Sequence, residues 1–118
     1  MKLYPIAAAL LLASLAAPAQ AQTVQDDVRC VLLSGVFIKS AKDEKGKQLA
    51  QITGAFYLGR LDGRADAKVL TEALRTESKA LGGKVAGPLM DACTARMGTA
   101  RKTMNEAGRA AAPAPPAK

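Results

Sequence analysis

The stretch LAQITGAFYLGRLDG, residues 49–63, decides how the rest of this chain is read. It holds two of the four aromatic residues and ends on Asp-Gly. Apolar or small residues recur in it at spacings of three and four, which places them on one face of a helix. These residues are Leu49, Ile52, Phe56 and Gly59. The stretch therefore predicts the central helix of a small bundle, closed by Gly63 in the left-handed conformation.

Two glycines lie inside this helix, at Gly54 and Gly59. Each costs up to about 1 kcal/mol relative to alanine in a helix interior. Their presence predicts the close approach of a neighbouring helix. The alternative is that they only loosen the helix.

The segment before this stretch predicts a first helix that starts near Asp26 or Asp27, where a carboxylate caps the first turn. Residues 28–38 are apolar on more than one face, so this helix should be largely buried. A strand also fits its β-branched content, but no second alternating segment exists to pair with it. Residues 40–47 predict a polar connection with Gly46 as its breaker.

Two more helices are predicted after the central one. Asp66 caps the third, which runs to about Leu81 and stops at two glycines. Pro88 suits the first turn of the fourth, which ends near Gly108. Its apolar stripe has helical spacing: Leu89, Cys93, Met97, Ala100, Met104 and Ala107. The sequence thus predicts an all-α, small four-helix bundle over residues 22–109, followed by a disordered Ala/Pro tail at 110–118.

The N-terminal 21 residues have the pattern of a secretory signal peptide. An apolar run from Ile6 to Ala17 is followed by Ala19 and Ala21, which suit cleavage before Gln22. A membrane anchor would need a longer apolar run, because a bilayer core is about 30 Å thick. We therefore expect a periplasmic or secreted protein of Gram-negative type, with no membrane span after cleavage.

The chain has two cysteines, Cys30 and Cys93. In an exported protein they are expected to form one disulfide that joins the first and last helices. Two free buried thiols or a two-thiolate metal site are the alternatives, and the absence of histidine and of a third soft ligand disfavours the metal site.

The composition argues against catalysis. No histidine is present, which removes the commonest general base, the Ser-His and Cys-His nucleophilic pairs and the commonest metal ligand. Asp62 and Asp66 remain as a possible carboxylate pair for glycoside hydrolysis, although each has a simpler structural use at a helix end. We expect no enzyme activity, no cofactor and no metal site.

The charge favours anionic partners. The chain has 17 basic and 10 acidic residues, and loss of Lys2 with the signal peptide leaves a net charge of +6. Transient contact with anionic envelope surfaces is expected. Nucleic-acid binding is not, because the basic clusters contain no interleaved aromatic residues. These clusters lie at Lys39, Lys42, Lys45 and Lys47 and at Arg101, Lys102 and Arg109.

The polar end of the opening stretch is the candidate partner-binding site. It combines Tyr57 with a mixed-charge corner: Arg60, Asp62 and Arg64. Both arginines can bind carboxylates or phosphates in a bidentate manner. The alternative is a solvated turn with local ion pairs. Likewise, Met90, Met97 and Met104 fit an adaptable binding groove or, as we favour at this spacing, the core.

The layout of the chain resembles two groups of small disulfide-stapled helical periplasmic proteins, the HdeA-type acid-stress chaperones and the Rap1a/Tai-type immunity proteins. It is also similar to short exported proteins that carry an FYLGRLDG phrase. The resemblance rests on these residues: Cys30, Phe56, Tyr57, Gly59, Asp62, Gly63 and Cys93. It implies a non-catalytic periplasmic protein that binds another protein, as a chaperone or an inhibitor does. The alternative is a carrier of lipid or another small hydrophobic ligand.

Overall fold

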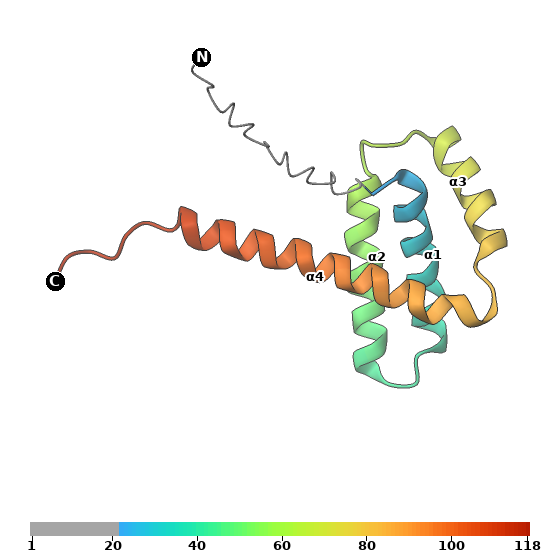
Figure 1. Cartoon of the computed structure of the whole chain (residues 1–118), viewed down its shortest axis with the longest axis horizontal. Helices are drawn as coiled ribbons and strands as arrows, with labels where there is room; N and C mark the ends of the chain where they lie inside the picture. The colour runs from blue at the N-terminus through green and yellow to red at the C-terminus, as the bar shows by residue number, and fades with distance from the viewer. Residues whose placement is uncertain (1–21) are drawn as a thin grey trace, which may run out of the picture.

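The computed structural model describes residues 22–118, and in this range it contains four α-helices and no strand (Figure 1). The helices are α1 (Val24–Ser40), α2 (Glu44–Leu61), α3 (Ala67–Ala80) and α4 (Ala86–Ala111), with a turn of 3₁₀ helix at Gly83–Val85. The predicted all-α class with four helices is confirmed. The predicted signal peptide lies outside the described residues. Nowhere in residues 22–118 does a helix combine the length and apolarity that crossing a membrane requires.

The helix at the centre of the fold is α1, not α2 as the sequence suggested. Within residues 22–118, α1 packs against all three other helices, whereas α3 packs on α1 alone. Figure 1 shows α1 between α2 and α3, with α4 crossing them. The broad apolarity of α1 explains its position, because a helix with several apolar faces can contact several neighbours. Cys30 and Leu33 of α1 are buried in one core cluster and Val28 in another.

The buried face of α2 differs from the predicted stripe. Leu49 and Ile52 are 46% and 52% exposed, so the prediction that they belong to the core is wrong. The buried residues are mostly small or polar ones: Ala50, Thr53, Gly54, Tyr57 and Leu61. Small residues on this face, such as Ala50 and Gly54, allow α1 and α2 to approach closely.

The two glycines of α2 have different roles. A Cβ at Gly54 would lie 3.1 Å from the Cβ of Ser34 on α1, so the predicted close approach is confirmed there. Nothing lies within 4 Å of a Cβ at Gly59, and the same prediction is wrong at that position. Gly63 has φ +74° after the end of α2, as predicted.

Side-chain caps fix three of the helix starts. Thr23 is the N-cap of α1 and forms a reciprocal capping box with Asp26. The helix therefore starts at Val24, two or three residues before the predicted Asp26 or Asp27, and neither aspartate is its N-cap. Asp43 accepts the amide of Gly46 at 2.8 Å and starts α2. Gly46 is therefore inside the helix and is not the predicted breaker. Asp66 accepts the amide of Val69 at 2.9 Å and caps α3, as predicted.

The predicted disulfide is present. Cys30 of α1 and Cys93 of α4 are joined across a sequence separation of 63 residues, and both are 4% exposed. Their cluster also contains Leu33, Tyr57 and Met90, so the covalent bond lies inside the main core.

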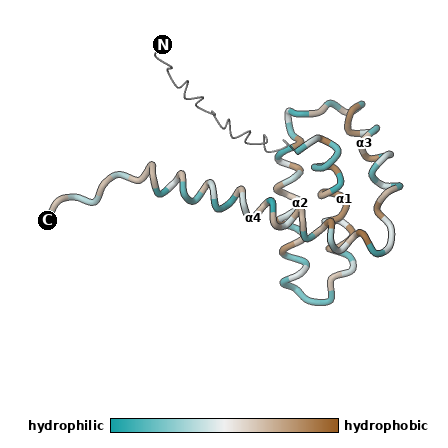
Figure 2. Tube along the Cα trace, in the orientation of Figure 1, coloured by the Kyte–Doolittle hydropathy of each residue, from teal (hydrophilic) through white to brown (hydrophobic). Residues whose placement is uncertain are grey.

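Only the first half of α4 belongs to this core. Met90 and Met97 are buried, as predicted, but Met104 is 71% exposed. All residues from Arg101 onward are exposed, and α4 continues through Gly108 to Ala111. We call the exposed second half of α4, residues 101–111, the arm. Figure 1 shows the arm projecting away from the other helices, and Figure 2 shows teal and pale colours along most of it.

Candidate functional site

Tyr57 was predicted to bind a partner, but the structure places it in the core. Its side chain has no exposed surface, and its hydroxyl donates a hydrogen bond of 2.8 Å to the backbone carbonyl of Cys93. Burial raises the pKa of the Tyr57 hydroxyl. Tyr57 therefore joins α2 to α4 beside the disulfide and is not available to a partner.

Arg60 and Arg64 both bind Asp27, a carboxylate with no exposed surface. The Nε of Arg60 lies 3.2 Å from both carboxylate oxygens, and Nη1 of Arg64 bonds to Oδ2. Arg64 also donates to the backbone carbonyl of Gln22 at 2.9 Å. These ion pairs connect α1 to the C-terminal end of α2 and the turn after it. Their partners are more than 30 residues apart in sequence, so patterns among neighbouring residues do not predict them.

A second ion pair connects α1 to α3. Arg29 donates to both carboxylate oxygens of Glu77, at 2.7 and 3.2 Å, and Glu77 is 4% exposed. The hydrogen bond with Glu77 raises the pKa of Arg29. Burial alone would raise the pKa of Asp26, but hydrogen bonds from Thr23 and the charge of Arg29 outweigh it and lower that pKa. The pair of Arg29 with Glu77 therefore stabilises the contact of α1 with α3, and the pairs of Arg60 and Arg64 with Asp27 stabilise the contact of α1 with α2.

Of the charged residues in the predicted corner, Asp62 is exposed and, unlike Arg60 and Arg64, makes no ion pair among the described residues. It ends α2, where its backbone amide donates to the carbonyl of Leu58 at 3.1 Å. Asp66 uses its carboxylate as the cap of α3, so it is not a free partner for Asp62. The predicted corner thus divides into a structural part and one carboxylate available to solvent.

Asp62 lies at the edge of an apolar hollow of about 370 Å³ between α2 and α3. Val28 and Val31 of α1 line it, with Leu58 and Leu61 of α2 on one side. Leu70 and Leu74 of α3 line the other side. Leu58 is 57% exposed and Leu74 is 42% exposed, so the hollow is open to solvent.

A second hollow, of about 300 Å³, adjoins the first at Val31 and continues along α1. Its other lining residues are Leu32, Gly35, Val36 and Lys39. Val28, Val31, Gly35 and Lys39 lie three or four residues apart and so share one face of α1. Gly35 has nothing within 4 Å of where a Cβ would be, which leaves this part open. We call the two hollows together the α1 groove.

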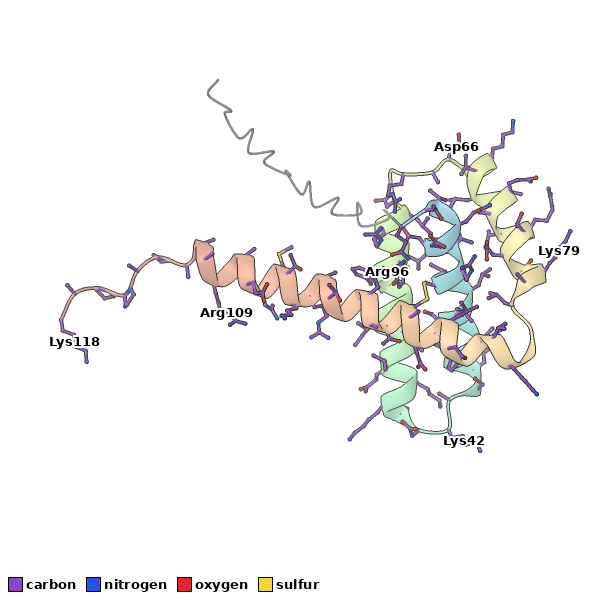
Figure 3. The ribbon with its side chains drawn as sticks, in the orientation of Figure 1. Lys42, Asp66, Lys79, Arg96, Arg109 and Lys118 are labelled. Atoms are coloured by element: carbon purple, nitrogen blue, oxygen red, sulfur yellow. A yellow bond between two sulfur atoms is a disulfide. The ribbon has the colours of Figure 1, made fainter. Side chains whose placement is uncertain are left out.

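The arm carries the second predicted basic cluster. Gly98, Arg101, Lys102, Asn105 and Arg109 line a shallow hollow along it. Figure 3 shows Arg109 on the arm and Lys118 at the end of the segment that follows it, both far from Lys42 and Lys79 at the other helices. Lys102 lies 3.9 Å from Glu106, an exposed ion pair of small energetic value.

Within residues 22–118, no group of three or more metal-binding side chains comes together. The α1 groove itself was not predicted from the sequence. Two features of the sequence pointed to it. Residues 28–38 of α1 are apolar on more than one face, and Leu58 and Leu61 widen the apolar stripe of α2.

Comparison of the chain with protein-family models, with curated proteins and with solved structures finds no match.

Proposed function

We propose that this chain is a non-catalytic protein of the cell envelope that binds a helix of another protein in the α1 groove. The observation that carries the proposal is the open apolar surface between α2 and α3. Helix-binding grooves take an amphipathic helix whose apolar residues recur at i, i+3, i+4 and i+7. Export is supported by the signal-peptide pattern, and the disulfide is compatible with an oxidising compartment.

The groove has the dimensions and chemistry for such a partner. From Val28 to Lys39 the backbone of α1 rises about 17 Å, roughly three helical turns. Among the residues that line the groove, the charged ones are Asp62 and Lys39, and the others are apolar or small. Open apolar surface flanked by charges is typical of a protein-binding site.

A matched pair of variants tests this proposal. Leu58→Glu adds a charge to the wall of the groove, and Leu49→Glu makes the same change on another face of α2, where Leu49 is 46% exposed. Tagged, oxidised full-length protein is used to capture partners from an envelope extract of its host. We expect the wild type and Leu49→Glu to retain the same protein and Leu58→Glu to lose it. Equal capture by both variants, or no capture by the wild type, would refute the proposal.

The apolar lining also supports a second candidate, a carrier of a small hydrophobic ligand in the first hollow. Its volume of about 370 Å³ lies in the range of small-molecule sites. Native mass spectrometry of protein purified from its host separates the two functions. A carrier retains a bound lipid mass that Leu58→Glu loses, whereas a protein binder shows the mass of the chain alone.

A further inference from the structure

The two charged residues of the α1 groove lie towards its opposite ends. Asp62 follows the last residue of α2 and lines the first hollow together with Val28, near the start of α1. Lys39 is in the last turn of α1 and lines the second hollow. Both residues are exposed. Among the residues that line it, the groove therefore has one acidic side chain towards one end and one basic side chain towards the other, with apolar or small residues between them.

Neither charge is used within the fold. The carboxylate of Asp62 makes no hydrogen bond or ion pair among the described residues, and the same holds for the ammonium of Lys39. This distinguishes them from Arg60 and Arg64, which bind Asp27. The two charges are free to interact with a docked molecule.

A docked helix also has two charged ends. Its macrodipole places about half a positive charge at the N-terminus and about half a negative charge at the C-terminus. The N-terminus is therefore favoured beside Asp62 and the C-terminus beside Lys39. α1 itself runs in this direction, from Val24 near the Asp62 end to Ser40 near the Lys39 end.

We infer that the α1 groove binds its partner helix in one orientation, parallel to α1, and selects a helix with basic residues in its first turn and acidic residues in its last turn. This inference rests on the proposed function and specifies the partner. The apolar floor supplies the affinity, and Asp62 and Lys39 set the direction.

The test uses a synthetic amphipathic helical peptide of about five turns, with leucines on one face, lysines in the first turn and glutamates in the last. A nitroxide on its N-terminus broadens the NMR signals of nearby amides. We expect broadening at Gly63 and Ala65 and not at Gly35 and Val36. A peptide with the same apolar face and the two charged turns exchanged should bind about fivefold more weakly, because two exposed charge interactions are lost.

The charge-exchanged protein Asp62→Lys/Lys39→Glu provides the decisive control. In this protein the broadening should move to Gly35 and Val36, and the preference between the two peptides should reverse. Circular dichroism and the intact mass of the disulfide-bonded protein confirm that each variant is folded. The side chain of Asp62 makes no internal bond that the exchange would remove.

Two NMR results would overturn the inference. One is equal broadening at both ends of the groove, or broadening at Gly35 and Val36 in the wild type. The other is an unchanged pattern in the charge-exchanged protein. Failure of the peptide to bind the wild type also refutes the inference, while capture of a partner that depends on Leu58 would still support the proposed function. Capture that does not depend on Leu58 refutes the proposed function itself.

Discussion

Asp27 is a charged residue with no exposed surface, and its carboxylate is held by Arg60 and Arg64. The side chains of the two arginines remain 35% and 39% exposed. A buried charge that loses its partners is costly, whereas the exposed guanidinium groups keep part of their hydration. Loss of both arginines would therefore cost more stability than loss of the Asp27 charge.

We predict that Asp27→Asn lowers the free energy of unfolding by about 1 to 2 kcal/mol, because a neutral amide replaces the charge-assisted hydrogen bonds that the carboxylate accepts from Arg60 and Arg64. Urea unfolding followed by circular dichroism measures the change. Asp91→Asn is the matched control, since Asp91 is exposed on α4 and makes no ion pair. A loss below about 0.5 kcal/mol for Asp27→Asn would mean that the cluster does not hold α1 and α2 together.

Tyr57 predicts a dependence of stability on alkaline pH. Its folded-state pKa lies above the ordinary value of 10.0, mainly because of burial. The folded protein therefore holds the phenolic proton more tightly than the unfolded chain. The stabilisation from Tyr57 is complete below pH 10 and is lost as the pH rises through the folded-state pKa.

Tyr57→Phe should remove this pH dependence and should also cost about 1 to 2 kcal/mol at neutral pH, because the carbonyl of Cys93 loses its donor. The measurement is the free energy of unfolding of both proteins between about pH 8 and pH 11. Parallel curves for the two proteins would contradict the predicted role of Tyr57.

The glycines of α2 give a prediction at the level of the element. Gly54→Ala places a Cβ 3.1 Å from the Cβ of Ser34, so α1 and α2 must separate slightly. We expect a loss of about 1 to 3 kcal/mol of stability. Gly59→Ala meets nothing within 4 Å and should stabilise the protein by up to about 1 kcal/mol, because alanine is the better helix former.

Thermal unfolding of the two alanine variants checks both signs in one experiment. The same substitution on the same helix should move the midpoint in opposite directions. A shift in the same direction for both would show that helix propensity, not the contact with Ser34, decides the effect.

The elements were more predictable from the sequence than their contacts. Caps such as Asp66 and turn residues such as Gly63 act through bonds to near neighbours, so the sequence shows them directly. The buried face of α2 was mispredicted because Leu49 and Ile52 have the right spacing and the right chemistry. Which of two apolar faces is buried depends on the fit to α1, and Gly54 opposite Ser34 provides that fit.

The candidate site was less predictable for the same reason. Arg60, Asp62 and Arg64 are close in sequence, but Asp27, which binds both arginines, is more than 30 residues away from each. The α1 groove requires three helices to be placed before it exists. Composition and periodicity indicate that surplus apolar surface is present, and only the packing of α3 on α1 shows where it lies.

At the level of the whole molecule, stability depends strongly on the disulfide between Cys30 and Cys93. On the chain-entropy estimate, a closed loop of 63 residues stabilises the folded state by about 4 kcal/mol. This is comparable with the net stability of a domain of this size, about 5 to 15 kcal/mol. The bond also joins the two helices that form the ends of the folded part of the chain.

We predict that the double variant Cys30→Ser/Cys93→Ser is less stable than the oxidised wild type by about 4 kcal/mol, measured by urea unfolding at neutral pH. Wild-type protein treated with a reductant should unfold at nearly the same urea concentration as the double variant. An oxidised and a reduced wild type with the same midpoint would contradict this prediction.

The arm gives the disulfide a mechanical consequence. Cys93 lies four residues before Met97, the last buried residue of α4, and the arm projects beyond that point. A force that pulls on the arm is therefore transmitted through a covalent bond into α1, the helix that contacts all the others. While the disulfide is intact, such a force can separate α4 from the other helices only as far as Cys93. Once the disulfide is reduced, only non-covalent packing resists the same force.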